Sequence, residues 1–183
     1  PICRYFLVAR DVGALTRAMS ATLEARQQKK TMSLSRLIPG RKRNLGVEGF
    51  IEEGGRLSVT GPEVFADDPV KLLKLFVCAD QHDLDVHPHA FSAVTRSLGL
   101  VTPKLRRNPE ATAALLHILA HGARPYRVLT IMNETGLLGR FLPEWGRIVG
   151  QTQFNMYHAY TVDEHTLQAI GIINDIARGK LKA

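Results

Sequence analysis

Three histidines and two aspartates gather in one short stretch of the sequence: His82, Asp83, Asp85, His87 and His89. Imidazole and carboxylate groups are good ligands for zinc or iron, so a metal site is one interpretation. Their spacing, however, bridges the end of one expected helix, a loop and the start of the next helix, and it matches no zinc signature. We therefore favour a polar turn between two helices over a metal site.

Asp83 and Asp85 also invite comparison with the paired acids of a nucleotidyltransferase, which hold two magnesium ions around a triphosphate. Such acids normally lie on a strand behind a glycine-rich phosphate loop. Here we expect them in a turn after a helix, without such a strand, so we reject this interpretation. His82 and Asp83 also fail as the dyad of an HD-type phosphohydrolase, because His82 is the first histidine of the chain and the required upstream histidine is missing.

His165 stands apart from this group, one turn into an expected helix. Thr161 and Glu164 have the spacing of a capping box, which predicts that the helix begins at Thr161. A histidine at that place can project into a helical bundle and bind a metal ion while its neighbours orient it. Most single histidines on helices are not ligands, so the spacing alone does not assign a metal to His165. The apolar face of this helix is expected to consist of Leu167, Ile170, Ile173 and Ile176.

Helices make up most of the structure expected around these residues. The apolar spacing predicts one amphipathic helix over residues 2–27, followed by a basic loop over residues 26–45. Two short strands around a Gly-Gly turn predict an isolated β-hairpin over residues 48–60. Residues 137–152 are expected to be rich in loops. Further helices should begin at Asp68-Pro69, His87-Pro88, Asn108-Pro109, Pro125 and Thr161. The predicted fold class is therefore mainly α, a bundle-like helical domain with one small β-hairpin.

The formal net charge of +7 comes from one segment rather than from the whole surface. Residues 26–43 hold seven of the 24 basic residues and no acid, so the remaining 17 basic residues balance the 17 acids. Such a run could attract phosphate or nucleic acid, but a solvated loop is the more usual role of a charged stretch.

The rest of the composition is that of an ordinary globular protein, with 45% hydrophobic and 22% charged residues among 183. No apolar run is long enough for a membrane helix, and no signal peptide opens the chain. Cys3 and Cys78 form no metal-type pair, and Cys78 is expected in the core, which favours a reducing cytoplasm. Because the chain begins at Pro1 within a helical pattern, we expect it to be part of a longer protein.

Several longer runs of the sequence resemble one protein family, in the same order along the chain. Residues 145–165, WGRIVGQTQFNMYHAYTVDEH, resemble the junction that leads into the HD domain of bacterial PII uridylyltransferase/uridylyl-removing enzymes. Residues 5–17 (YFLVARDVGALTR) resemble the helix that follows the nucleotidyltransferase domain of these enzymes. Residues 68–76 (DPVKLLKLF) and 132–144 (MNETGLLGRFLPE) resemble their central helical region. The resemblance covers essentially the whole chain.

The resemblance implies a function in nitrogen regulation. In this family a nucleotidyltransferase domain transfers UMP from UTP to a tyrosine of the PII signalling protein, and an HD domain hydrolyses the UMP off again. Glutamine selects between the two activities, and magnesium or manganese is the metal. By the same resemblance, residues 1–150 form the helical domain that follows the nucleotidyltransferase domain, and residues 151–183 form a truncated start of the HD domain.

His165 corresponds, by this resemblance, to the first metal-binding histidine of the HD site. The other ligands and the nucleotidyltransferase motif should lie outside this sequence. One imidazole cannot by itself position a divalent ion and activate water. We therefore expect this segment to be inactive alone and to hold no firmly bound metal, and its role would be to position the two active sites.

Two alternatives remain open. The central helices are also similar to the neck and body of tRNA nucleotidyltransferases and bacterial poly(A) polymerases, where Lys74 would replace a nucleotide-binding arginine. Lys74 can meet phosphate as a point charge but lacks the bidentate fork of arginine. The second alternative is a binding module without enzymatic activity, whose basic loop docks an acidic protein or RNA. The run from Tyr160 to His165 favours the uridylyltransferase over the first alternative, and nucleic acid is not the expected partner. The second alternative predicts binding that weakens steeply with salt.

Overall fold

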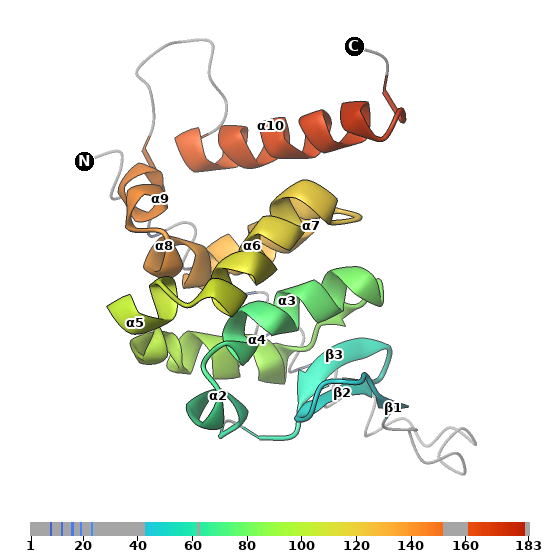
Figure 1. Cartoon of the computed structure of the whole chain (residues 1–183), viewed down its shortest axis with the longest axis vertical. Helices are drawn as coiled ribbons and strands as arrows, with labels where there is room; N and C mark the ends of the chain where they lie inside the picture. Colours follow the sequence, from blue (N-terminus) through green and yellow to red (C-terminus); the bar gives the residue numbers. More distant parts are fainter. Residues whose placement is uncertain are drawn as a thin grey trace.

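The computed structural model describes residues 43–61, 63–151 and 161–181, together with the single positions 8, 12, 16, 19 and 23. This part of the chain is mostly helical and carries one small sheet at one end, which confirms the predicted fold class (Figure 1). The five single positions are all helical. The rest of the helix expected over residues 2–27, and most of the basic loop expected over residues 26–45, lie outside the described residues.

The β-hairpin forms where the sequence predicts it, but it is not isolated. Strands β2 (Phe50–Glu53) and β3 (Arg56–Val59) pair antiparallel, and the Gly-Gly turn between them has φ values of 59° and 75°, which favour glycine. Strand β1 (Arg43–Asn44) pairs antiparallel with β2, and β4 (Asp85–Val86) pairs parallel with β3. The sequence did not reveal β1 and β4, because strands of two residues are too short to leave an alternating pattern.

Helix α3 (Lys71–Gln81) begins slightly later than the sequence predicts. The predicted cap at Asp68 is wrong, because the N-cap residue of α3 is Val70 and no side chain caps this helix. Asp68 Oδ1 instead accepts a hydrogen bond from Val70 N at 3.0 Å, in the turn before the helix. Pro69 also lies in the turn before the helix rather than at its first position. A one-turn helix, α2 (Val64–Asp67), precedes this turn and is too short to have been recognised from periodicity.

The helices that follow a cap-and-proline pair begin where predicted. His87 and Asn108 each precede a proline, and their side chains accept hydrogen bonds from backbone N–H groups of the first helical turn. Asn108 Oδ1, for example, accepts from Glu110 N at 2.8 Å and from Ala111 N at 3.2 Å. The middle of the chain thus folds into α4 (Pro88–Arg96), the 3-10 helix η2 (Leu98–Leu100), α5 (Pro103–Arg106), α6 (Pro109–His121) and α7 (Pro125–Glu134).

The segment that was expected to be rich in loops contains two short helices, α8 (Leu137–Phe141) and α9 (Pro143–Ile148). Gly136, at φ 82°, ends α7 and reverses the chain into α8. The two helices approach closely at a pair of glycines, because a Cβ atom on Gly139 would lie 3.2 Å from Gly146 Cα. The segment does not form one long helix, as predicted, because Pro143 ends the path of α8 and starts α9. Gly146, however, does not break a helix, since it lies inside α9 and allows close packing against Gly139.

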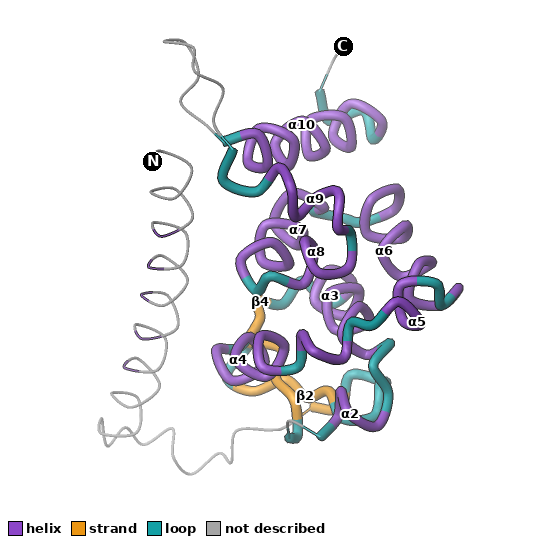
Figure 2. The backbone as a smooth tube through the Cα atoms, turned by 90° about the vertical axis from the view of Figure 1, so that its left-hand side faces the viewer, coloured by secondary structure: helices purple, strands orange, loops and turns teal. Residues whose placement is uncertain are grey.

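Helix α10 (Val162–Ala177) is the last described element, and it lies across α7 (Figures 1 and 2). The capping box predicted at its start is wrong. Thr161 is the N-cap residue, but its side chain makes no cap hydrogen bond. Glu164 does not reach back to Thr161, and its Oε1 instead accepts a hydrogen bond from Tyr126 Oη at 2.7 Å. Glu164, which the local pattern assigned to capping, thus makes a tertiary contact with Tyr126 instead.

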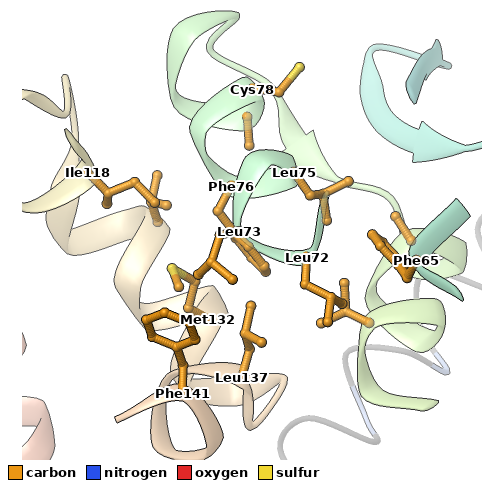
Figure 3. Close-up of a cluster of buried hydrophobic side chains, with 14 of the residues drawn as sticks. Phe65, Leu72, Leu73, Leu75, Phe76, Cys78, Ile118, Met132, Leu137 and Phe141 are labelled. Atoms are coloured by element: carbon orange, nitrogen blue, oxygen red, sulfur yellow. The ribbon is translucent and has the colours of Figure 1, made fainter. Parts of the chain in front are cut away.

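One hydrophobic core joins the hairpin, the central helices and α10. Its centre is α3, and Met132 and Leu137 lie against this helix from α7 and α8 (Figure 3). The cluster reaches from Phe50 in the hairpin to Leu167 in α10. Cys78 is buried in it, as predicted, and burial raises the pKa of its thiol to about 11. The fully buried residues of α3 are Leu72, Leu73, Leu75 and Phe76.

None of the helices in the described part of the chain is long and apolar enough to cross a lipid bilayer. The longest of them, α10, has 16 residues and carries acids in its first turn.

Candidate functional site

His165 lies in the first turn of α10, and its side chain is exposed. Three isoleucines share this side of the helix, because residues at spacings of seven, eight and eleven positions point in similar directions. Ile172, Ile173 and Ile176 expose 52%, 65% and 38% of their surface. We call His165 and these isoleucines the exposed face of α10. The sequence predicted that Ile173 and Ile176 would be buried with Leu167, and the structure corrects this.

The opposite side of α10 is held against the helical domain. Asp163, Leu167 and Asn174 are buried there, and Ile170 packs at the edge of the core. We call these four residues the docked face of α10. Leu167 has no exposed surface at all. The helix as a whole packs on α7.

A buried polar network fixes the start of the docked face. Asp163 Oδ1 accepts a hydrogen bond from Gly150 N at 3.0 Å, and Asp163 Oδ2 accepts one from Asn133 Nδ2 at 3.0 Å. Asn133 Oδ1 accepts in turn from Trp145 Nε1 at 2.9 Å. The network therefore joins α7, α9 and α10 and lies two residues from His165. Because a buried carboxylate needs such donors, these contacts hold α10 in one position.

The far end of the docked face is anchored to the loop between α6 and α7. Arg178 Nη2 donates hydrogen bonds to His121 O at 2.8 Å and to Gly122 O at 2.6 Å. Gly171 allows the close approach between these anchors, since a Cβ atom there would lie 2.9 Å from Tyr126 Cβ. Together with the Asp163 network, these contacts fix both ends of α10 and therefore the direction in which His165 points.

The described residues do not complete a metal centre around His165. Its acidic neighbours are already engaged, Asp163 with Asn133 and Gly150, and Glu164 with Tyr126. Across residues 43–61, 63–151 and 161–181, no three His, Cys, Asp or Glu side chains are arranged to hold an ion. A single imidazole does not fit a divalent metal by itself, so any metal at His165 requires ligands from elsewhere.

The histidine and aspartate cluster after α3 forms a polar connection, as predicted. His82 and Asp83 occupy a turn, although Asp85 begins strand β4 rather than lying in that turn. The aspartates bind arginines. Asp83 pairs with Arg124 and Arg127, and Asp85 pairs with Arg127. Their charge is therefore balanced by guanidinium groups within the domain.

His87, in the same cluster, has a structural role as the N-cap residue of α4. Its Nδ1 accepts a hydrogen bond from His89 N at 3.1 Å, which caps α4. Burial lowers the pKa of His87 below its ordinary value, and the charges of His89 and Arg56 lower it further while Glu53 raises it. The neutral imidazole that results is the form able to accept this hydrogen bond.

Lys74 lies on α3, away from α10, and its Nζ contacts Glu110 Oε1 at 2.6 Å. The structure therefore does not bring together the two residues selected from the sequence, His165 and Lys74. The residues that position α10, Asn133 and Asp163, were not recognised. An acid in the first turn of a helix has an ordinary explanation in the helix dipole, so Asp163 left no distinct signal.

Comparison with known proteins places these elements in a family. Residues 50–141 match the family model described as the uridylyltransferase GlnD third domain. The chain is 58% identical over 182 residues to a bifunctional uridylyltransferase/uridylyl-removing enzyme of Caulobacter vibrioides and 57% identical to one of Phenylobacterium zucineum. These matches cover 97% of the chain but only 19% of each relative. No solved structure matches the chain. The chain belongs to the GlnD uridylyltransferase family, in which residues 50–141 correspond to the third domain.

Proposed function

We propose that this chain is the part of a bifunctional uridylyltransferase/uridylyl-removing enzyme that holds its two active sites in a fixed arrangement. The enzyme would transfer UMP from UTP to the PII signalling protein and hydrolyse it off again in the cytoplasm, under the control of glutamine and with magnesium or manganese. The identity of 58% along 97% of the chain supports this assignment.

We propose the same division of the chain as the sequence predicts. Residues 1–150 would belong to the helical domain after the nucleotidyltransferase domain, and residues 151–183 would begin the HD domain. His165 would contribute one imidazole to the HD metal site, whose other ligands lie outside this chain. The exposed face of α10 supports this proposal, because an exposed histidine beside three exposed isoleucines is unusual on a helix that covers no partner.

The observation that carries the proposal is the contrast between the two faces of one helix. The Asp163 network and Leu167 hold α10 on the helical domain, while His165 points away from it. A helix held in this manner would fix the position of the HD domain relative to the helical domain. The chain alone would then lack both complete active sites and would be catalytically inactive.

The decisive experiment replaces His165 in the longer protein. His165→Ala should lower UMP removal at least about 100-fold, because a direct ligand matters more than the supporting residues of a metal site. It should leave UMP transfer within about twofold, since α10 remains docked through Asp163. The matched control is His82→Ala, an exposed histidine in the turn after α3.

The outcomes separate the competing assignments. Loss of removal in His165→Ala, with normal activity in His82→Ala, supports the split site. Equal loss in both variants, or binding of stoichiometric metal by the 183-residue chain alone, would place the chemistry in the His82, His87 and His89 cluster instead.

A further inference from the structure

A pocket lies in the helical domain, and no residue of α10 lines it. It has a volume of about 340 Å³ and lies where the η2–α5 segment meets α8 and the start of α9. Small-molecule sites commonly have volumes from about 300 Å³ upward. Thr102, Arg106, Gly139 and Arg140 are among the residues that line it. The pocket is therefore large enough for a compact ligand, and two of its side chains carry positive charge.

The described part of the chain supplies no counter-charge to the two guanidinium groups of this pocket. Among the residues that the structure describes, neither Arg106 nor Arg140 forms an ion pair or a hydrogen bond through its side chain. Arg106 Nε is buried without a partner, and no aspartate or glutamate lines the pocket. Glu144 follows the lining residue Pro143, but it is exposed and does not line the pocket. A partly buried, uncompensated cation is unfavourable, so an anion at this place would be stabilised.

The chain around the pocket adds to its positive electrostatic potential. Residues 86–109 contain no acid, and their basic residues are Arg96, Lys104, Arg106 and Arg107. A concave site with charges of one sign concentrates ligands of the opposite sign. The sequence alone did not single out this segment, because the longer basic run at residues 26–43 dominates the charge pattern.

We propose that this pocket binds a phosphate group of a small molecule. Two arginine forks can each donate paired hydrogen bonds to phosphate oxygens. Thr102 Oγ1 accepts from Leu105 N at 3.4 Å, which leaves its hydroxyl hydrogen as a further donor. Donors from three side chains suit the several oxygens of a phosphate better than the two of a carboxylate. The site is separate from His165 and does not depend on the activity proposed above.

Isothermal titration of the 183-residue chain tests this proposal. The probes are inorganic pyrophosphate, UMP and, as a dicarboxylate, glutarate. Pyrophosphate should bind saturably at one site per chain, and glutarate should bind at least about tenfold more weakly. Tighter binding of UMP than of pyrophosphate would identify a nucleotide as the source of the phosphate. The reverse order would identify a free phosphate compound.

Substitutions distinguish a specific phosphate site in the pocket from general attraction to a positively charged surface. Arg106→Gln and Arg140→Gln should each weaken pyrophosphate binding at least about tenfold. Arg107→Gln is the matched control, because Arg107 ends the same helix, is exposed and does not line the pocket. It should change the affinity by less than about twofold. Since Arg140 is exposed, its variant also tests the proposal if Arg106→Gln fails to fold.

Three results would overturn the inference. If the heat of binding of pyrophosphate does not reach saturation in the titration, no specific site exists. Equal weakening by Arg107→Gln and Arg140→Gln would show general attraction to a basic surface. Binding of glutarate as tight as that of pyrophosphate would remove the phosphate assignment.

Discussion

The two faces of α10 carry similar apolar side chains but have opposite surroundings. Leu167 on the docked face is completely buried, whereas 65% of the surface of Ile173 on the exposed face is accessible to solvent. The docked face also contains the buried Asp163, and the exposed face contains His165. Sequence periodicity treats both sets of residues as one hydrophobic stripe. The difference teaches that periodicity alone does not separate the residues of α10 that pack on the helical domain from those that stay exposed.

The largest expected effect comes from removing apolar volume on the docked face. Leu167→Ala should lower the free energy of unfolding by about 3–4 kcal/mol, because it leaves a cavity in the shared core. Ile173→Ala is the matched control and should change it by less than about 0.5 kcal/mol. Urea unfolding followed by circular dichroism measures both values. Equal losses would mean that the two faces are not different in this chain.

The Asp163 network should rank second. Asp163→Ala leaves Asn133 Nδ2 and Gly150 N buried without their acceptor, which should cost about 2–3 kcal/mol in unfolding free energy. Asp175 is the control on the same helix, because its ion pair with Lys180 is largely solvent-exposed. Asp175→Ala should cost less than about 1 kcal/mol. A small effect at Asp163 would remove the network from the account of how α10 is held.

A third prediction uses the histidine that caps α4, in contrast to the exposed His165. Because burial holds the pKa of His87 below its ordinary value, the unfolded chain binds a proton more readily than the folded one. The stabilisation is present above the ordinary pKa of about 6.5 and is lost as the pH falls through the lower folded-state pKa. The loss should be about 1 kcal/mol, the usual contribution of a helix cap.

Unfolding midpoints measured from pH 7.5 to pH 5 check this dependence. His87→Asn keeps a capping side chain but does not titrate, so it should flatten the profile. His89→Gln keeps the His87 cap but removes one charge that lowers its pKa, so it should make the decline shallower without abolishing it. A decline that persists in His87→Asn would assign the pH dependence to other groups.

The smallest effect is expected at the Lys74–Glu110 pair. Both side chains are partly exposed, so Lys74→Ala should change the unfolding free energy by about 0.5 kcal/mol or less. The nucleotide role proposed for Lys74 is tested separately in the longer protein. UTP dependence that is equal in wild type, Lys74→Ala and the control Lys71→Ala would end that role.

Local signals were enough to predict several elements of the fold. The cap-and-proline pairs before α4 and α6 act within a few residues, and the hairpin turn depends on two adjacent glycines. The short helices α8 and α9 were missed because Gly139 and Gly146 are needed for contact between them, which a local pattern does not reveal. Tertiary contacts of this kind override propensity.

The candidate site was predictable only in part. The position of His165 near the start of a helix followed from its sequence context, and the structure places it there. The direction in which His165 points depends on the contacts of Asp163 with Asn133 and Gly150. These two residues are 30 and 13 positions from Asp163 in the sequence. Likewise, the pocket at Arg106 and Arg140 joins helices that are far apart in the sequence. Long-range pairs leave no periodic signal.

Hydrogen exchange of α10 in the 183-residue chain tests the central claim most directly. The account predicts that the backbone amides of residues 166–177 are protected to an extent similar to those of α7, and that Asp163→Ala removes this protection before that of α7. Exchange of these amides in the wild-type chain at the rate of an unstructured peptide would contradict it. In that case α10 would not be held by the helical domain, and His165 would have no fixed direction.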